Sequence, residues 1–223
     1  MKLSNNTISV LKNYATINQN LMIKGGKEIT TMSAMKNIIA RAEVEEDFPQ
    51  EVAIYDLNEF LSCLSLFKIP NLEFNNSYVM ISEDEKPTTK MKYFYSDPSV
   101  VTTPEKMITM PSNEITFTLD SATLSNITKA AAVISSADLV LENTSGTSSL
   151  TVKDKKNDTA NTFSLDVTTT SEGNFNCFFT VENLKVMDGN YDVEISSKNI
   201  SHLSSSNKDV EYWVALEPES TYE

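Results

Sequence analysis

Hydrophobic and polar positions alternate with a period of two along many short segments of this 223-residue chain. Such alternation is typical of strands that bury one face of a sheet. It is found in residues 51–55, 78–82, 114–118, 139–142, 162–167, 176–181, 191–196 and 212–216. Turn-forming residues such as Gly25-Gly26 and Asp188-Gly189-Asn190 separate some of these segments. The pattern predicts a strand-rich protein with a few short helices.

Two longer segments have a helical period instead. In residues 5–18 and 121–134, apolar side chains recur every three or four positions, as in a helix with one buried face. Ser4 and Asp120 stand directly before these segments and are expected to cap the helices. The two segments therefore predict helices with similar starts, offset by about half the chain.

A second pair of similar segments has nearly the same offset. Residues 55–60 and 179–184 each contain an aromatic residue, a capping residue and the apolar positions of a short helix. Asp56 and Glu59 have the spacing of a capping box. The repeat predicts two copies of one α+β unit, each with a strand-rich layer and two short helices on one face. Chance similarity between capped helices is the alternative.

The middle of the chain is rich in residues that break regular structure. Residues 96–111 contain Pro98, Pro104 and Pro111, which disfavour a helix and interrupt a central strand. We therefore predict an N-terminal domain in residues 1–95, a connector in 96–112 and a C-terminal domain in 113–223.

The formal charge of −13 excludes general electrostatic attraction to nucleic acid. Residues 1–112 contribute −3 and residues 113–223 contribute −10. The two predicted helices nevertheless contain no carboxylate, and their only charges are Lys12 and Lys129. Either the helix faces are kept clear of negative charge because a polyanion passes close to them, or they lack acids by chance.

Other features exclude several classes of protein. No apolar run reaches the roughly 20 residues of a membrane span, and the first residues lack the apolar core of a signal peptide, so neither insertion nor export is expected. Cys63 and Cys177 lie in apolar segments and are expected to be buried thiols. With a single histidine, no zinc site of usual spacing is expected.

No catalytic constellation is present in the sequence. Gly25-Gly26 lacks the Lys-Ser/Thr of a phosphate loop, and His202 is expected in a serine-rich loop. The acidic runs 45–47 and 83–85 are expected to be solvated turns. The basic and aromatic residues in 90–95 suit base stacking or an ordinary strand, and the strand is favoured. These features predict a binding protein.

Several stretches spread over the whole chain are shared with a known family. They are residues 1–4 (MKLS), 11–18 (LKNYATIN), 52–58 (VAIYDLN), 64–66 (LSL), 97–99 (DPS), 214–217 (VALE) and 220–221 (ST). On these stretches the chain resembles the sliding clamps, or DNA polymerase processivity factors, of T-even-type bacteriophages. That family belongs to the PCNA-like clamp superfamily.

The resemblance implies a non-enzymatic, ring-forming homotrimer without a cofactor. Each protomer would hold two tandem copies of an α+β clamp domain, with antiparallel sheets outside and two short helices each inside. Duplex DNA would pass through the ring without sequence specificity. On matching positions, Lys12 and Lys129 would lie on lining helices, and Lys185, in an expected helix at 181–187, would be a third DNA-facing residue.

The resemblance also implies a set of partners. A polymerase C-terminal peptide would dock in an apolar groove between the domains, formed by Met107, Ile108, Met110, Pro111, Ala215, Leu216 and Pro218. The alternative is that these linker side chains only hold the linker on its own domains. An ATP-dependent clamp loader, late-transcription sigma and co-activator proteins, and a location in the cytoplasm of an infected bacterium are implied as well.

Two other functions compete with the clamp. A strand-rich subunit of a phage tail or baseplate would share the acidic composition, and a hydrolase with an unrecognised site is a third class. A virion subunit gives no reason for acid-free helix faces, so the paired helices favour the clamp.

Overall fold

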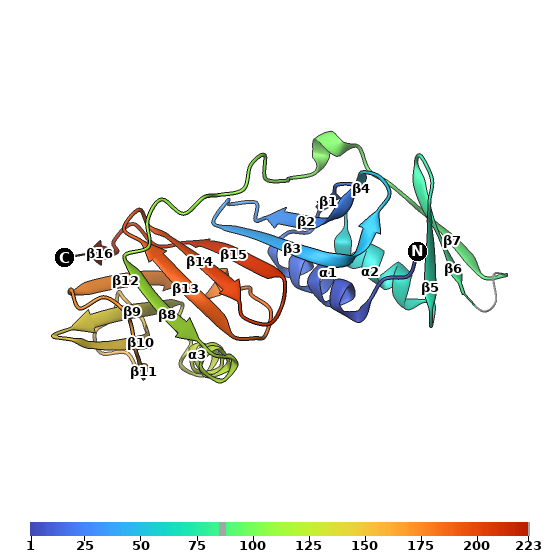
Figure 1. The fold of residues 1–223 in the computed structure, drawn as a ribbon. Coiled ribbons are helices and arrows are strands. Elements are labelled where there is room, and N and C mark those ends of the chain that lie inside the picture. Colours follow the sequence, from blue (N-terminus) through green and yellow to red (C-terminus); the bar gives the residue numbers. More distant parts are fainter. Residues whose placement is uncertain (85–87, 223) are drawn as a thin grey trace. The chain divides into compact units, whose positions relative to one another are not determined.

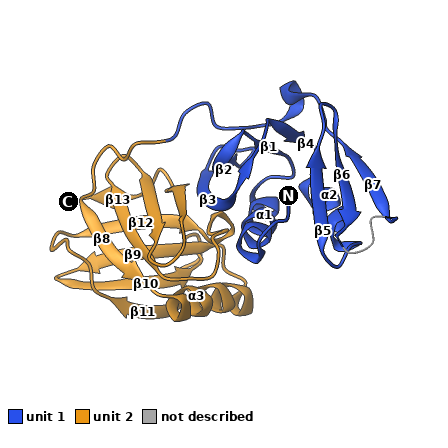
Figure 2. Ribbon diagram, turned by 45° about the vertical axis from the view of Figure 1, so that its right-hand side comes forward, with its two compact units in different colours: residues 1–107 blue, residues 108–223 orange. Residues whose placement is uncertain are grey.

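A computed structural model describes residues 1–84 and 88–222 of the chain. It divides into two compact units, unit 1 over Met1–Met107 and unit 2 over Ile108–Glu223 (Figure 2). The boundary lies within the connector predicted for residues 96–112. Each unit contains both helix and antiparallel sheet, as the predicted α+β class requires.

Unit 1 combines two helices with three groups of antiparallel strands (Figure 1). Strand β1 pairs with β4, β2 pairs with β3, and β5, β6 and β7 form a three-stranded sheet in that order. The elements are α1 (Asn5–Ile17), β1 (Leu21–Ile23), β2 (Gly26–Met32), β3 (Ile38–Phe48), β4 (Val52–Ile54), α2 (Leu57–Ser65), β5 (Pro70–Phe74), β6 (Tyr78–Glu83), β7 (Lys90–Phe94) and the 3₁₀ turn η1 (Pro98–Val100).

Both helices of unit 1 begin at the residues that the sequence predicted. The Ser4 side chain accepts a hydrogen bond from the N–H of Thr7 at 3.2 Å, and Asp56 accepts one from the N–H of Glu59 at 3.0 Å. These bonds satisfy N–H groups that have no partner inside a helix. The ring of Phe60 on α2 packs edge-on against Tyr93 of β7, with the ring centroids 5.1 Å apart.

Unit 2 has two antiparallel sheets and one helix. One sheet has the order β15-β14-β13-β8, and the other has the order β11-β10-β9-β12-β16. The elements are β8 (Ile115–Leu119), α3 (Ser121–Ile134), β9 (Asp138–Thr144), β10 (Thr147–Lys153), β11 (Phe163–Val167), β12 (Phe175–Thr180), the 3₁₀ turn η2 (Val181–Asn183), β13 (Tyr191–Ser196), β14 (Ile200–Ser205), β15 (Val210–Ala215) and β16 (Thr221–Tyr222).

The core of unit 2 lies between its two sheets and α3. A small cavity of about 20 Å³ marks the place where they meet, and it is lined by apolar residues alone. These residues are Phe117, Leu119, Leu124, Ile127, Leu139, Leu150, Phe179, Leu184, Val193 and Leu203. The cavity has room for about one water molecule, but its lining offers that molecule no polar partner, so it is a packing gap and not a ligand site.

All eight segments predicted as strands contain strands, and the two capped helices are confirmed. The predicted helix at 181–187 is wrong, because the segment holds only the three-residue turn η2. Thr180 makes no capping hydrogen bond with the turn, and the Leu184 N–H reaches back only to the Val181 carbonyl. A single turn without a cap does not repay the cost of starting an α-helix. The described residues therefore contain three α-helices, not four.

Two acidic runs differ from the predicted turns. Residues 45–47 belong to β3, where Glu45 and Asp47 occupy exposed positions and Phe48 is buried. In the second run, Glu83 ends β6 and accepts hydrogen bonds from the backbone of residues 68–69. Asp84 pairs with Lys2 at 2.6 Å, and Glu85 lies outside the described residues. Long-range contacts therefore place part of this acidic sequence in regular structure.

The prediction of a loop at His202 is also wrong. His202 lies in β14, and its ring stacks on Trp213 of β15 with centroids 4.7 Å apart. Its two ring nitrogens lie 3.4 Å from Glu194 Oε2 and 3.2 Å from Glu211 Oε2. The neighbouring strands β13 and β15 supply these groups, so the position is a cross-strand cluster within the sheet.

The predicted burial of both thiols is confirmed. Burial raises the pKa of Cys177 to about 12, which keeps the thiol protonated at neutral pH. The basic and aromatic segment at 90–94 forms β7, as the favoured interpretation predicted. Within residues 1–84 and 88–222, no helix is long and apolar enough to cross a bilayer.

Candidate nucleic-acid interface and partner groove

Helix α1 presents a polar face without a carboxylate. One side of the helix buries Val10, Leu11 and Tyr14 in unit 1. The exposed positions on the other side are Asn5, Ser9, Lys12 and Thr16. Lys12 is therefore the charged group of that face, where an ammonium can meet a phosphate without a neighbouring acid on the helix.

Helix α3 has the same character in unit 2. It buries Leu124, Ile127 and Ala131, and its C-terminal half exposes Lys129 and Val133. Val133 is 82% exposed although it is apolar. The helix contains no acid, so Lys129 stands on a face as free of carboxylates as that of α1.

Neighbouring elements supply negative groups to the N-termini of these helices. In unit 1, Glu46 of β3 accepts hydrogen bonds from the Ser4 N–H and the Thr7 hydroxyl. In unit 2, Asp188 accepts a hydrogen bond from the Ser121 hydroxyl at 2.5 Å, and Asn190 accepts one from the Ser121 N–H at 2.9 Å. Carboxylates stabilise the positive end of a helix dipole. Because they come from outside the helices, the helix faces stay free of acids.

Lys185, the third predicted DNA-facing residue, is placed differently. It is exposed, but it follows η2 in a segment without regular structure. In unit 1, the corresponding segment is the full helix α2, which exposes Asn58, Glu59 and Ser62. The acid-free face is therefore a property of α1 and α3, and the second segment of each unit carries an acid, Glu59 or Glu182.

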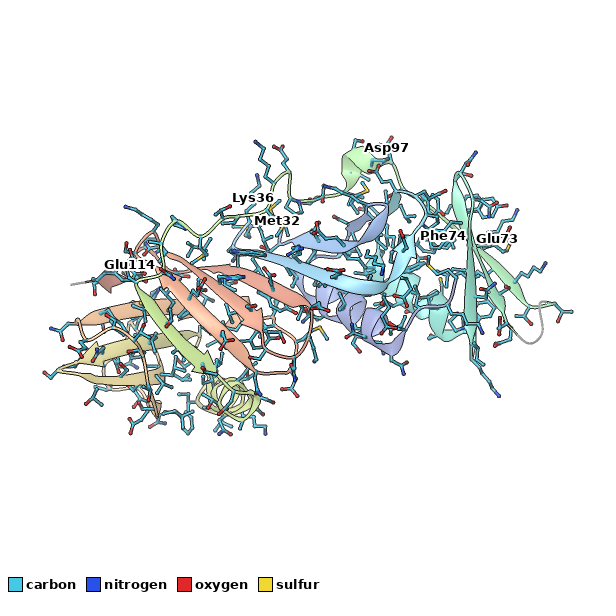
Figure 3. The ribbon with its side chains drawn as sticks, in the orientation of Figure 1. Met32, Lys36, Glu73, Phe74, Asp97 and Glu114 are labelled. Atoms are coloured by element: carbon cyan, nitrogen blue, oxygen red, sulfur yellow. The ribbon has the colours of Figure 1, made fainter. Side chains whose placement is uncertain are left out.

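A groove of about 620 Å³ lies within unit 1, between the β2–β3 hairpin and residues 98–106. Its apolar lining includes Met32 and Ile39 of the hairpin and Val101 after η1. Lys36 at the hairpin tip and Lys106 also line it. Figure 3 shows Met32 and Lys36 beside the connector. Glu105, Ser99, Thr102 and Thr103 line the groove as well, so its basic residues exceed its acidic residues by one. Such a mixed surface fits a peptide that has apolar side chains and a small excess of acidic ones.

Local hydrogen bonds shape both walls of this groove. The Ser33 hydroxyl accepts the N–H groups of Asn37 and Ile38, both at 3.1 Å, and closes the hairpin. Asp97 accepts the N–H of Ser99 at 2.8 Å and starts η1. A hydrogen bond from the Ser99 hydroxyl, together with the one from its N–H, lowers the pKa of Asp97. The contribution of the hairpin was missed from the sequence, because its contact with the connector joins residues about 65 positions apart.

The groove residues predicted from the sequence lie on both sides of the unit boundary. Met107, Ile108 and Met110 are partly exposed and Pro111 is exposed. In unit 2, Ala215 is partly exposed, Leu216 is buried and Pro218 is exposed. The Leu216 N–H donates to the Asn199 carbonyl at 2.9 Å, which fixes the start of the C-terminal tail. Their role in partner binding stays a prediction.

Comparison with known proteins identifies the family to which the chain is similar. A family model described as DNA polymerase processivity factor matches residues 2–103. The sliding clamp of Vibrio phage KVP40 is 32% identical over 97% of this chain and 99% of its own length. The sliding clamp of Escherichia phage RB69 is 28% identical over the full length of both chains.

Solved structures with much lower sequence identity share the fold of this chain. A solved structure of A. fulgidus PCNA with the C-terminal region of FEN-1 superposes with a TM-score of 0.69 over 96% of each chain, at 13% identity. At that identity the likeness shows the PCNA-like clamp fold and no more. Together, the acid-free helices in two α+β units, the fold and the full-length similarity to phage clamps show that this chain belongs to the sliding-clamp family of DNA polymerase processivity factors.

Proposed function

We propose that the chain assembles into a closed homotrimer, encircles duplex DNA and tethers a DNA polymerase during viral DNA replication, without catalysing a reaction itself. The carrying observation is the pair of acid-free helices, one in each unit, in a chain of formal charge −13. A strongly acidic protein does not hold DNA by general attraction. A ring holds it by topology, and a few lining lysines permit sliding.

Strand edges of opposite charge support a head-to-tail ring. In unit 1, β7 is the outermost strand of its sheet and exposes Lys90 and Lys92. In unit 2, β11 is outermost and exposes Ser164 and Asp166. Pairing β7 of one copy with β11 of the next would cover both edges. The same heterologous contact, repeated, closes a ring.

The assembly has a direct test. Three copies of 24.8 kDa give a particle of about 74 kDa by light scattering. Changing Lys90 and Lys92 to Glu should lower the mass toward that of one protomer, and adding Asp166→Lys should restore part of the trimer. The same charge change at the exposed Lys24 and Lys27 is the control. A monomeric wild type or an open polymer would refute the ring.

Partner binding is proposed for the same protein. A C-terminal region of FEN-1 binds A. fulgidus PCNA, and we expect the C-terminal peptide of the cognate polymerase to bind this chain. Two variants locate the site: Met32→Asp in the groove of unit 1, and Met107→Asp with Ile108→Asp in the connector. A charge placed in an apolar contact should weaken binding tenfold or more, about 1.4 kcal/mol or above. Unchanged affinity in both, by calorimetry, would exclude the groove and the connector.

We also propose the wider role that the family resemblance implies. An ATP-dependent clamp loader would open and close the ring, and sigma and co-activator proteins of late transcription would use it as a mobile activator. The place of action would be the cytoplasm of the infected bacterium. A tail or baseplate subunit gains no support from the similar proteins found. Primed circular DNA with the cognate loader and polymerase tests the role, and products no longer than those made without the protein would contradict it.

A further inference from the structure

The C-terminal tail of unit 2, residues 217–222, runs along the outer edge of β12. The Glu217 N–H donates to the Phe178 carbonyl at 2.8 Å, and the Phe178 N–H donates to the Ser220 hydroxyl at 3.0 Å. Further along, β16 pairs with β12 through Tyr222 and Thr221. The tail therefore satisfies backbone groups that an open strand edge would leave unpaired.

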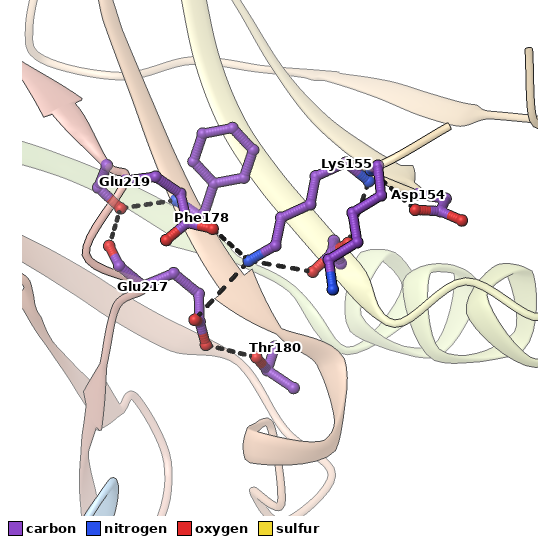
Figure 4. A network of polar contacts seen from close by, with 9 residues as sticks. Asp154, Lys155, Phe178, Thr180, Glu217 and Glu219 are labelled. Carbon is purple, nitrogen blue, oxygen red and sulfur yellow. Dashed lines mark hydrogen bonds and ion pairs between the residues drawn. The ribbon is translucent and has the colours of Figure 1, made fainter. Parts of the chain in front are cut away.

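One lysine joins this tail to the body of unit 2 (Figure 4). Lys155 Nζ lies 2.5 Å from Glu219 Oε1 and 3.7 Å from Glu217 Oε2, both on the tail. It also lies 3.8 Å from Asp138 Oδ1 at the start of β9. The Lys155 side chain is only 20% exposed. Its ammonium thus bridges the tail and β9 from a partly desolvated position.

The remaining contacts fix the two carboxylates around the ammonium. The Thr180 hydroxyl donates to Glu217 Oε1 at 2.6 Å, and the Lys155 N–H donates to Asp138 Oδ2 at 3.1 Å. Hydrogen bonding and charge from Lys155 hold the pKa of Glu219 below its ordinary value. The Glu219 carboxylate is therefore ionised at neutral pH and held beside Lys155.

Lys155 is the cation that pairs with every carboxylate of this cluster. One ammonium faces three carboxylates, of which the Asp138 side chain is only 12% exposed. If the ammonium is removed, Glu217, Glu219 and Asp138 lose the one group that pairs with all three. Like charges in a partly buried site repel more strongly than they do in water. The docked position of the tail then loses its main attraction and gains repulsion.

We propose that Lys155 is a positioning residue for partner binding, which keeps the tail docked on β12 so that residues 215–218 stand ready to meet a partner peptide. The part of this inference that concerns partner binding rests on the proposed function. The docking of the tail does not, because it follows from contacts within unit 2. Lys155 acts through the tail and needs no contact with the peptide.

Hydrogen exchange of the full-length protein tests the docking. Lys155→Met keeps most of the aliphatic stem and removes the charge, and we expect it to lose amide protection between residues 217 and 222. The charge of the neighbouring, exposed Lys156 also acts on Glu219, so Lys156→Met should lose some protection, but much less than Lys155→Met. Lys155→Arg should restore it, since a guanidinium also pairs with carboxylates. Protection in Lys155→Met equal to that of the wild type would overturn the proposal.

Peptide affinity tests the consequence. If the tail is docked in only about one tenth of the Lys155→Met molecules, the polymerase peptide should bind about tenfold more weakly. Added salt should weaken binding to the wild type more than to Lys155→Met, because only the former depends on the ion cluster. A wild type that does not bind the peptide would count against the proposed function. Equal affinity and salt dependence in both proteins would refute the role of Lys155 alone.

Discussion

Equivalent segments of the two units fold differently. Residues 55–60 and 179–184 match in character, yet the first begins the nine-residue helix α2 and the second forms only the turn η2. In unit 1, Asp56 caps its helix and also accepts a hydrogen bond from the Gln19 amide at 3.0 Å. In unit 2, the Thr180 hydroxyl donates to Glu217 of the tail instead.

The two capping positions differ in what their side chains contact. Thr180 stands where a cap is needed, but its hydroxyl points to Glu217 of the tail and accepts no hydrogen bond from the turn. The Val181 N–H also donates out of the segment, to the Ala137 carbonyl at 2.8 Å. Both contacts point the start of this segment toward other elements of unit 2, and the cap that starts α2 in unit 1 is not formed.

The largest expected effect concerns the matched apolar residues Phe60 and Leu184. Phe60 is 3% exposed on α2, whereas Leu184 is partly exposed after η2. Phe60→Ala should destabilise unit 1 by about 3–5 kcal/mol, and Leu184→Ala should destabilise unit 2 by about 1–2 kcal/mol. Urea unfolding with hydrogen exchange resolved by unit measures both. Equal losses in the free energy of unfolding would mean that η2 stabilises unit 2 as much as α2 stabilises unit 1.

The second prediction asks whether α1 and α3 share the DNA-facing role. Lys12→Glu and Lys129→Glu each exchange three positive for three negative charges in a trimer. Each should slow loading onto primed circular DNA by roughly tenfold, and the double variant by more, because screening at physiological salt reaches only about 8–10 Å. Loading kinetics at several salt concentrations measure this. The defect should deepen at low salt, and wild-type loading by the double variant would exclude these faces from the DNA path.

The third prediction concerns the caps. Asp56→Ala removes a helix cap and should lower the melting temperature of unit 1 by a few degrees, while Asp56→Asn, which also caps well, should change it little. Thr180→Ala should leave η2 unchanged and loosen the tail instead. Hydrogen exchange at 57–65 and at 217–222 separates the two effects. A loss of protection at 181–184 in Thr180→Ala, with the tail intact, would contradict this assignment.

The smallest expected effect is on pH dependence. Hydrogen bonds from the Glu59 N–H and the Gln19 amide lower the pKa of Asp56 below its ordinary value of 3.8. A depressed pKa means that the folded state favours the ionised acid. The ionised Asp56 side chain therefore stabilises the folded state fully above about pH 3.8, and this stabilisation is lost as the pH falls through the pKa of the folded state. Thr180 does not titrate, so protection in α2 should fall in acid before protection at 181–184 does. In Asp56→Asn, protection in α2 should no longer fall in this pH range, because asparagine does not titrate.

Much of the fold could be predicted because its signals are local. Ser4 and Asp120, the capping residues of α1 and α3, stand next to the helices that they start, and alternation marked strands that bury one face. Strand β3 was missed because Glu46 occupies a position where alternation calls for an apolar side chain. Its carboxylate is satisfied by the N-terminus of α1, about 40 residues away. No local pattern reports such a partner.

The residues of the candidate site also divide into those that local sequence predicts and those that it does not. Lys12 and Lys129 were found from helix periodicity and the absence of acids, which are properties of neighbouring residues. The Met32 and Lys36 side of the groove and the Lys155 cluster were not found, because each joins segments distant in the chain.

The sequence by itself determined the two capped helices, their acid-free faces, the half-length repeat and the family resemblance, since each depends on residue identity and short-range spacing. Only the tertiary structure decided that 181–184 is a turn, that His202 lies in a sheet and that Lys155 holds the tail. Those outcomes depend on hydrogen-bond and ion-pair partners from different elements, such as Glu217, which accepts a hydrogen bond from the Thr180 hydroxyl across 37 positions of the chain. Only the folded chain brings such groups within reach of one another.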